Sequence, residues 1–225
     1  METRGEKSFI KMQLIPARIY DWLTDVKGVN EAFIKISNII SGKLIDGRLL
    51  EIGFGPGRLL EELRNLVPQL ELHGLDISAS MLKIAYKRLG TKPELRLGSI
   101  EKSNYSDDFF DCIVCSCSFY NWDNPVEGLN EMYRILKPGQ TAFLFETTRD
   151  FDPELLGINL QNNLVGYGQT QRILSTVFLK KQLKMTYSTA EFNELILQSK
   201  FKDNYNIVRD VLGSLPIYVR IELTK

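Results

Sequence analysis

Short apolar runs alternate with amphipathic segments along the first two thirds of the chain. Most segments between the runs carry apolar residues at helical spacing, whereas the runs themselves have the length of buried strands. The five runs lie at 48–53, 70–76, 93–98, 111–117 and 141–147. Strands that alternate with helices in this way predict an α/β fold with a parallel, right-handed, doubly wound sheet and helices on both of its faces.

The last 40 residues follow a different pattern. Ser188 and Glu191 have the spacing of a capping box, which marks a helix start. A strand is predicted at 205–210 and a turn near Gly213, and apolar and polar residues then alternate strictly over 217–224. Such alternation is absent from the earlier strands and is typical of an antiparallel strand near a sheet edge. We therefore expect a mostly parallel, seven-stranded sheet that ends in an antiparallel hairpin.

Two segments lie outside the alternation, within what we predict to be one domain of 225 residues. Residues 1–47 contain two amphipathic helices, at 16–27 and 30–43, after a start of mixed charge that is expected to fold over the ligand. Tyr20 and Trp22 in the first helix are candidates for lining the ligand pocket.

The second segment, residues 148–187, is too long for a simple connection between a strand and a helix. It has a helical pattern of its own, formed by Ile173, Leu174, Val177 and Phe178. An insertion after the fifth strand rises beside the carboxyl edge of the sheet, so we predict a lid over a substrate. An oligomer contact is the alternative role.

The composition is that of an ordinary globular domain. The 225 residues are 44% hydrophobic and 25% charged, and 28 basic side chains balance 28 acidic ones. This balance gives no reason to expect a nucleic-acid partner or a disordered chain. No stretch approaches the roughly 20 apolar residues that cross a bilayer, and none resembles a signal peptide. The expected location is the cytoplasm, and the expected state is a monomer or a homodimer.

The three cysteines all lie in the fourth predicted strand. In an extended strand Cys115 and Cys117 share a face and Cys112 lies on the other, so the three thiols cannot converge on one metal ion. We expect buried, reduced cysteines and no metal site.

The first strand leads directly into a glycine-rich turn, Glu-Ile-Gly-Phe-Gly-Pro-Gly at 51–57. Glycines let the backbone turn sharply and approach a ligand closely, and the amides after Gly57 open a helix and point at that ligand. Glu51 would repel a pyrophosphate, but it can accept hydrogen bonds from an ammonium group or from the loop amides. The pattern therefore favours a zwitterionic or cationic ligand over a polyphosphate.

This pattern, Glu-x-Gly-x-Gly-x-Gly, resembles the first motif of class I S-adenosylmethionine-dependent methyltransferases. A dinucleotide-binding fingerprint would instead have its third glycine at the position of Arg58. Two later stretches resemble the same family: Phe110-Asp111 before the fourth strand, and 131–139, which matches Glu-x-x-Arg-x-Leu-Lys-Pro-Gly. The resemblance covers residues 48–147. In motif style the chain is similar to quinone-biosynthesis methyltransferases. The resemblance implies a Rossmann-like fold with the terminal hairpin.

The resemblance also implies where S-adenosyl-L-methionine binds. Asp76, at the end of the second strand, would take both ribose hydroxyls, and capping of the next helix is its alternative role. The family usually has an acid where this chain has Ser99, so Ser99 or Glu101 would accept the adenine amino group. The implied cofactor-binding residues are Glu51, Gly53, Phe54, Gly55, Gly57, Asp76, Ile77, Ser99, Ile100, Glu101, Ser116 and Ser118.

By the same resemblance, the chain is expected to be a methyltransferase that moves the sulfonium methyl group to a small-molecule acceptor by in-line displacement and releases S-adenosyl-L-homocysteine. The protein then mainly aligns the reacting groups and excludes water. No catalytic acid or base stands out, and the candidates for a proton acceptor are Tyr105, Tyr120 and Asp123.

Side chains after the fourth strand bear on the acceptor. Phe119, Tyr120 and Trp122 are expected at the pocket mouth, opposite apolar residues and lysines of the 148–187 insertion. Such a mouth suits a small, partly apolar or aromatic acceptor. A hydrophobic plug is the alternative role of Phe119 and Trp122. Two other functions stay open for the chain: a cofactor-binding or regulatory protein without catalysis, and a nicotinamide-dependent oxidoreductase.

Overall fold

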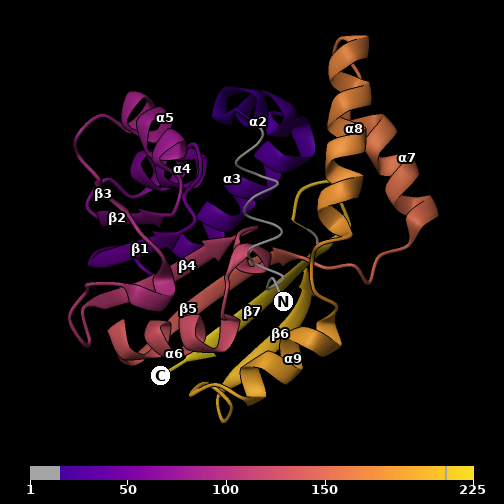
Figure 1. The fold of residues 1–225 in the computed structure, drawn as a ribbon. Coiled ribbons are helices and arrows are strands. Elements are labelled where there is room, and N and C mark those ends of the chain that lie inside the picture. Colours follow the sequence, from indigo (N-terminus) through magenta and orange to yellow (C-terminus); the bar gives the residue numbers. More distant parts are fainter. Residues whose placement is uncertain (1–15, 211) are drawn as a thin grey trace.

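Seven strands form a single sheet in the order β3-β2-β1-β4-β5-β7-β6 (Figure 1). The computed structural model describes residues 16–210 and 212–225. Neighbouring strands run parallel from β3 to β5, whereas β7 is antiparallel to both β5 and β6. The strands are β1 (Arg48–Ile52), β2 (Glu71–Asp76), β3 (Glu94–Leu97), β4 (Phe110–Ser116), β5 (Leu136–Thr147), β6 (Tyr205–Asp210) and β7 (Tyr218–Thr224). The predicted doubly wound sheet with a terminal antiparallel hairpin is confirmed.

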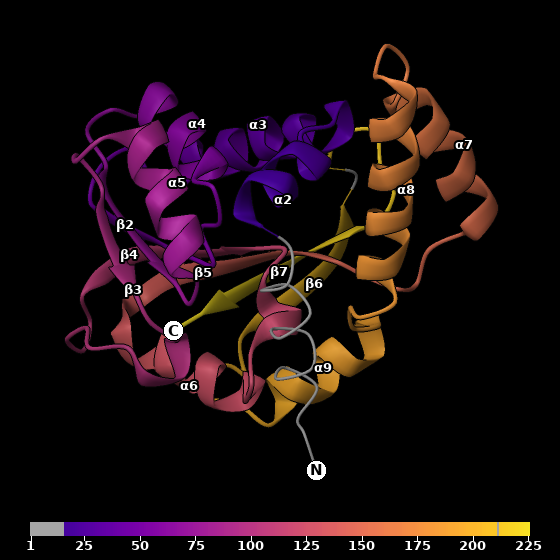
Figure 2. The ribbon, with the colours of Figure 1, turned by 45° about the horizontal axis from the view of Figure 1, so that its top comes forward.

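Helices cover both faces of this sheet. Figure 1 shows α2 to α5 on one side and α6 and α9 on the other, while α7 and α8 stand together beside α2 (Figures 1 and 2). The helices are α2 (Ala17–Thr24), α3 (Lys27–Ser41), α4 (Arg58–Leu66), α5 (Ala79–Leu89), α6 (Pro125–Ile135), α7 (Pro153–Asn163), α8 (Gln169–Leu183) and α9 (Thr189–Leu197).

Residues of the central strands alternate between two apolar layers. Leu49 of β1 lies in the layer shared with α3 and α4, and Leu50 lies in the layer shared with α6; both side chains are fully buried. Because both faces are covered, the buried positions of these strands are mainly apolar on both faces instead of alternating with polar residues. Helix α9 begins with the predicted capping box. The Ser188 hydroxyl accepts from Glu191 N (3.2 Å), and Glu191 Oε2 accepts from Ser188 N (2.7 Å).

The fifth strand starts earlier than its apolar run suggests. Helix α6 ends at Ile135, and β5 begins at Leu136, which pairs with Phe110 of β4 before the register shifts. The Lys-Pro-Gly stretch of the 131–139 motif therefore lies within the irregular first part of β5, where Gly139 has a φ of +75°. Pairing with a neighbouring strand extends β5, and this contact is not visible in local sequence.

The helical pattern in the 148–187 insertion identifies a helix but mostly the wrong face. Phe178 packs against the core and Tyr20, but Ile173, Leu174 and Val177 of α8 are 45–59% exposed. The buried residues of α8 are Ser175, Leu179, Gln182 and Leu183. The buried polar residues are hydrogen-bonded: Ser175 Oγ donates to the Leu23 carbonyl at 2.8 Å. The packed face of α8 is partly polar, so apolar positions alone do not identify it.

The apolar pattern of the predicted 16–27 helix also fits only part of the packed surface. Leu23 and Val26 are buried, but Ile19 and Trp22 are 46% and 40% exposed. Tyr20 lines the cavity as predicted, whereas the same expectation for Trp22 is wrong because its side chain faces outward. The expectation that the first residues fold over the ligand concerns 1–15, which lie outside the described residues. Within the described ranges, no helix is both long and apolar enough to span a membrane.

Candidate functional site

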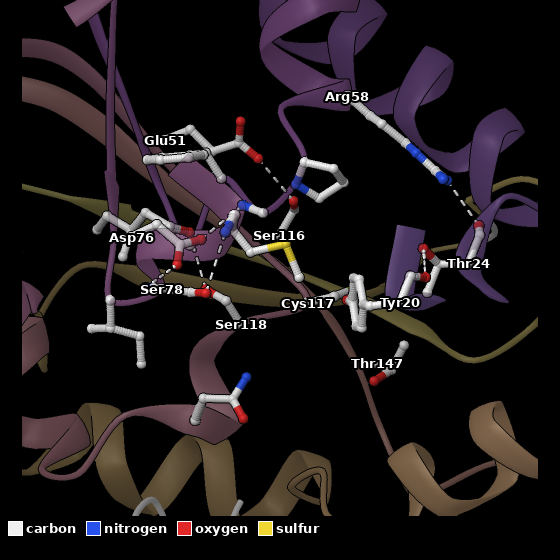
Figure 3. Close-up of a pocket in the computed structure, with 18 of the residues that line it drawn as sticks. Tyr20, Thr24, Glu51, Arg58, Asp76, Ser78, Ser116, Cys117, Ser118 and Thr147 are labelled. Carbon is white, nitrogen blue, oxygen red and sulfur yellow. Dashed lines mark hydrogen bonds between the residues drawn. The ribbon is translucent and has the colours of Figure 1, made fainter. Parts of the chain in front are cut away.

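A cavity of about 240 Å³ lies at the carboxyl ends of β1, β2, β4 and β5 (Figure 3). It opens where the strand order reverses, because β1 lies between β2 and β4. Ligands of open α/β sheets bind at this kind of switch point. Side chains of α2, α3 and α8 complete the wall, among them Tyr20, Phe33, Leu179 and Leu183.

The glycine-rich turn after β1 forms one wall of the cavity. Gly53, Gly55 and Gly57 all have positive φ values of +70°, +52° and +84°. A Cβ on Gly53 would lie 2.2 Å from Ser118 Oγ, whereas a Cβ on Gly55 would meet no atom within 4 Å. Gly57 is not among the lining residues, and a Cβ there would lie 2.9 Å from Leu89 Cδ1 of α5. Gly57 thus lets α4 and α5 pack closely behind the turn.

Glu51 places a buried carboxyl group beside this turn. The residue is 1% exposed, and its Oε1 accepts from Ser116 Oγ at 3.2 Å. Its Oε2 has no hydrogen bond of normal geometry to a described residue, although the Leu60 backbone amide favours the charged form of the carboxyl group. Burial raises the pKa of Glu51 well above its usual range, because the charged form loses its hydration. A cation in the cavity would supply the missing partner and favour the ionised form.

Asp76 connects the end of β2 to the glycine-rich turn. Its Oδ2 accepts from Gly55 N and its Oδ1 from Ser78 N, both at 2.8 Å. Burial raises the pKa of Asp76, and these two backbone hydrogen bonds oppose that rise. The cap of α5 is the Ser78 hydroxyl, which accepts from Met81 N at 3.3 Å. Asp76 is therefore not the capping residue, and its carboxylate oxygens keep lone pairs for a ligand.

Ser99 and Glu101 have different positions relative to the cavity. Ser99 and Ile100 line it, whereas Glu101 does not. Glu101 Oε1 accepts from Asp123 N at 3.0 Å, and its Oε2 accepts from the Ser99 hydroxyl. The Ser99 hydroxyl therefore donates its hydrogen bond to Glu101, and its oxygen stays available as an acceptor at the cavity wall.

Comparison with known proteins identifies the family of this central region. Residues 50–144 match the methyltransferase domain family. This region is a class I methyltransferase domain. The uncharacterized methyltransferase YdaC of Bacillus subtilis is 34% identical over 46% of this chain and 58% of its own length. The ubiquinone/menaquinone biosynthesis C-methyltransferase UbiE of Pectobacterium carotovorum is 30% identical over 60% of this chain and 57% of its own length. The chain thus spans a little over half of these curated relatives.

Solved structures share the fold of the methyltransferase domain over nearly the whole chain. The plantazolicin methyltransferase BpumL, solved with SAH, has a TM-score of 0.63 and 18% identity, with 97% of this chain and 88% of that one covered. A SAM-dependent methyltransferase from Aquifex aeolicus has a TM-score of 0.60 and 16% identity, with 96% of each chain covered. At these identities the likeness concerns the fold.

Of the three candidate proton acceptors in the methyltransferase domain, one side chain lines the cavity. Asp123 belongs to the wall, whereas Tyr105 packs against His73 and Phe110 and has its pKa raised to about 12 by burial. Tyr120 is 1% exposed, and its hydroxyl accepts from Gln182 Nε2 at 2.8 Å. The predicted position of Tyr120 at the mouth is therefore wrong, because its ring is part of the core.

Trp122 and Phe119, the other two aromatic residues expected at the mouth, differ in their position relative to the cavity. Trp122 lines the cavity, whereas Phe119 is fully buried. The Phe119 ring lies 4.6 Å from Trp122 and 5.5 Å from Phe192 between ring centres. The alternative role of Phe119 as a hydrophobic plug matches this packing.

The end of β4 departs from the expected strand. Strand β4 stops at Ser116, and Cys117 has a φ of +52°, which is uncommon for a residue other than glycine. Cys117 lines the cavity, whereas Cys115 lies in the opposite apolar layer, so the two thiols do not share a face. The left-handed turn at Cys117 is the reason for this error.

Glu146 stabilises this turn from β5, and the sequence analysis did not single it out. Its side chain is fully buried, and Oε1 accepts from Ser118 N at 3.0 Å and from Phe119 N at 3.1 Å. Burial raises the pKa of Glu146 to about 7. An acid at the carboxyl end of an apolar strand is the only signal in the sequence that could have identified it.

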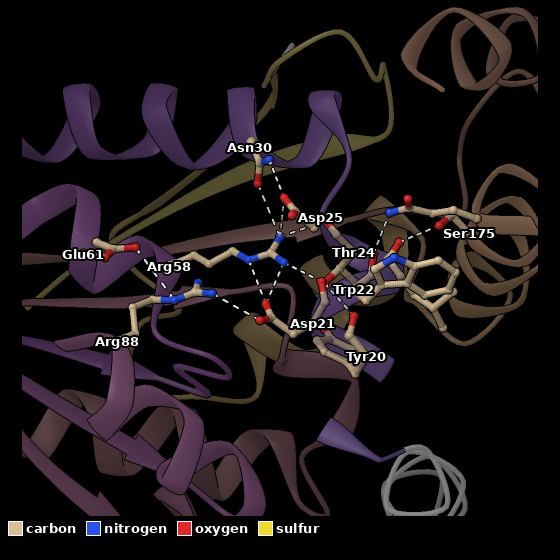
Figure 4. Close-up of polar contacts among 12 residues, drawn as sticks. Tyr20, Asp21, Trp22, Thr24, Asp25, Asn30, Arg58, Glu61, Arg88 and Ser175 are labelled. Carbon is tan, nitrogen blue, oxygen red and sulfur yellow. Dashed lines mark hydrogen bonds and ion pairs between the residues drawn. The ribbon is translucent and has the colours of Figure 1, made fainter. Parts of the chain in front are cut away.

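Arg58, at the start of α4, connects the methyltransferase domain to α2 (Figure 4). It is 8% exposed, and its Nη2 lies 2.6 Å from Asp21 Oδ1 while its Nη1 donates to the Thr24 carbonyl at 2.9 Å. Arg88 of α5 reaches the other oxygen of Asp21 at 3.1 Å. Tyr20, which lies next to Asp21 in α2, is held over the cavity by these contacts. In the sequence, Arg58 was informative only because it stands where a dinucleotide-binding fingerprint would have its third glycine.

Proposed function

We propose that this protein transfers the methyl group of S-adenosyl-L-methionine to a small-molecule acceptor and releases S-adenosyl-L-homocysteine. The methyltransferase family of residues 50–144 supports this proposal. The observation that carries it is Glu51, a buried carboxyl group with one oxygen unpartnered among the described residues, beside a cavity and a glycine-rich turn. An ammonium group satisfies such a carboxylate, whereas a pyrophosphate would be repelled by it.

Different residues around the cavity would bind different groups of this cofactor. Glu51 would bind the ammonium group, Asp76 the ribose hydroxyls, and Ser99 the adenine amino group. The rest of the proposed contact set lines the same cavity: Gly53, Phe54, Gly55, Ile77, Ile100, Ser116 and Ser118. Gly57 and Glu101 would act indirectly, Gly57 through the packing of α4 and Glu101 through its hydrogen bond from Ser99.

The residues of this chain would bind and orient the reactants. The sulfonium group of the bound cofactor supplies a methyl group that is already activated for displacement. Side chains of α2 and α8 line the cavity. They would exclude water and hold the acceptor in line with the methyl group. Asp123 stays as a proposed proton acceptor, whereas Tyr105 and Tyr120 are buried away from the cavity wall.

We also propose that α7 and α8 form a lid over the acceptor. Leu179, Gln182 and Leu183 of α8 contribute to the cavity wall, which supports a small, partly apolar or aromatic acceptor. All three cysteines are free thiols, which agrees with the reducing cytoplasm as the proposed location. The proposed state is a monomer or a homodimer without a nucleic-acid partner.

The proposed activity can be tested by label transfer. The protein is incubated with methyl-labelled S-adenosylmethionine and fractionated cell extract, and the small molecules are then separated and counted. A labelled product that forms only with active protein supports the enzyme. Tight cofactor binding without label transfer in any fraction would favour the alternative, a regulatory protein that binds the cofactor without catalysis.

A further inference from the structure

The two ends of the cavity differ in chemical character. Figure 3 shows Glu51 and Asp76 at one end, and Tyr20 and Thr147 at the other. Tyr218 belongs to the second end, because it pairs with Thr147 across β5 and β7 and also lines the cavity. The cofactor contacts proposed above use the carboxylate end. The Tyr20 end is therefore left for the acceptor.

Within the described part of the chain, no cationic side chain is available at the Tyr20 end. Among the lining residues that the structure describes, Arg58 is the only lysine, arginine or histidine. Its guanidinium group already bonds to Asp21, to the Thr24 carbonyl and to Asn30. A carboxylate or phosphate on the acceptor would therefore lose its hydration without gaining a counter-charge from the described residues, which is costly.

Hydroxyl groups are the main polar feature of the same end. Thr147 is 5% exposed, and its Oγ1 has no hydrogen-bond partner among the described residues. The hydroxyls of Tyr20 and Tyr218 likewise make no hydrogen bond to another described residue. Burial raises the pKa of both tyrosines, so both stay neutral and can donate or accept a hydrogen bond.

Apolar and aromatic side chains complete the lining of the cavity. Val29 and Phe33 of α3, Leu183 of α8 and Ile217, which precedes Tyr218, line it together with the two tyrosine rings. Aromatic ligands gain contact area and favourable ring–ring geometry against such walls. The apolar lining, the charge and the hydrogen-bonding groups therefore select the same class of ligand.

We propose that the Tyr20 end is the acceptor site, and that it takes an uncharged aromatic compound whose hydroxyl or carbonyl oxygen is bound by Tyr20, Tyr218 and Thr147. This inference rests on the proposed function and goes beyond it by naming the charge, the polar group and the residues that select the acceptor.

Binding of two matched probes to the protein saturated with S-adenosylhomocysteine tests this site. The probes are 2-naphthol, which is neutral, and 2-naphthoate, which carries a negative charge on the same ring. Calorimetry should give a dissociation constant for 2-naphthoate at least about tenfold weaker than for 2-naphthol. Tyr20→Phe, Tyr218→Phe and Thr147→Val should each weaken 2-naphthol by about three- to tenfold, which is the range for one lost hydrogen bond.

Tyr86→Phe is the matched control. The Tyr86 hydroxyl donates to the Leu95 carbonyl at 3.1 Å, and Tyr86 is not among the lining residues, so its loss should leave 2-naphthol affinity unchanged. Three results would overturn the inference. They are absence of 2-naphthol binding, equal binding of the two probes, and 2-naphthol affinities of Tyr20→Phe and Tyr218→Phe that equal that of the control. Failure of S-adenosylhomocysteine itself to bind would instead overturn the proposed function.

Discussion

Asp76 has a structural role in addition to its proposed contact with the cofactor. It accepts hydrogen bonds from Gly55 N and Ser78 N, so it fixes the glycine-rich turn relative to the start of α5. The place of Asp76 at the end of the second predicted strand and the family resemblance were enough to select it from sequence. The bond to Gly55 depends on how β1 and β2 lie side by side, and the sequence did not reveal it.

Asp76→Ala should weaken binding of S-adenosylmethionine by about 1.5–3 kcal/mol, because hydrogen bonds to a charged group are lost. The loss of order in the Gly55 turn adds to this effect. Isothermal titration of the wild type and the variant measures the difference, with exposed Asp46→Ala as the control. An unchanged dissociation constant in Asp76→Ala would rule out the ribose contact.

Glu146 gives the protein a pH dependence that can be measured. Its pKa rises from 4.5 to about 7 on folding, so the folded state binds this proton more tightly than the unfolded state. The resulting stability is fully present below about pH 4.5 and is lost as the pH rises through about 7, by about 3 kcal/mol in all.

Glu146→Gln should remove this dependence and keep an oxygen that accepts from Ser118 N and Phe119 N. Urea unfolding of both proteins between about pH 4 and about pH 8 gives the difference in their free energies of unfolding. This difference should change by about 3 kcal/mol across the range. A constant difference would mean that Glu146 titrates near its ordinary pKa.

At the scale of elements, α2 depends on Arg58 for its position. The helix has eight residues, and a helix of that length is not stable alone in water. Its contacts with α4 and α8 include buried polar groups beside the Tyr20–Phe178 ring contact: Asp21 accepts from Arg58, and the Leu23 carbonyl accepts from Ser175. The apolar period of the sequence therefore located the helix but could not predict which surface holds it.

Arg58→Met should lower the free energy of unfolding by about 3–5 kcal/mol, because it leaves the mostly buried Asp21 carboxylate with a weaker partner. Arg88→Met is the matched control, since Arg88 contacts the same carboxylate from a more exposed position. Its loss should cost about 1 kcal/mol. Urea unfolding measures both values, and equal losses in the two variants would contradict the assignment of Arg58 as the main anchor of α2.

The proposed lid of α7 and α8 makes a prediction about hydrogen exchange. Backbone amides of residues 153–183 should exchange faster than those of β1 and β4 in the free protein, and they should slow when S-adenosylhomocysteine and 2-naphthol are both present. Exchange followed by mass spectrometry with each ligand alone is the control. Full protection of this segment in the free protein would show a fixed structural element instead of a lid.

At the scale of the whole molecule, the sequence was sufficient to predict the sheet but not all of its details. Alternation of buried strands with helices indicated a parallel sheet, and the period of two over 217–224 indicated its antiparallel end. The start of β5 at Leu136 depends on pairing with Phe110, which no local pattern records.

The candidate site could likewise be predicted only in part. Glu51 and Asp76 lie near the ends of β1 and β2 and Ser99 follows β3, in a pattern that resembles one family, so the sequence placed them at the cavity. Thr147 and Tyr218 come together only because β5 and β7 pair, and their separation along the chain gives no sign of this contact. The end where we propose that the cofactor binds was therefore predictable, whereas at the other end the sequence indicated Tyr20 but neither Thr147 nor Tyr218.

The central claim concerns which cofactor the methyltransferase domain of this chain binds, and thermal unfolding tests it most directly. A ligand that binds only the folded state raises the melting temperature by mass action. S-adenosylmethionine and S-adenosylhomocysteine should raise the melting temperature, NADH and NADPH should not, and Glu51→Gln should reduce the shift. A shift with the nicotinamide cofactors and none with the two adenosyl compounds would contradict the account and favour an oxidoreductase.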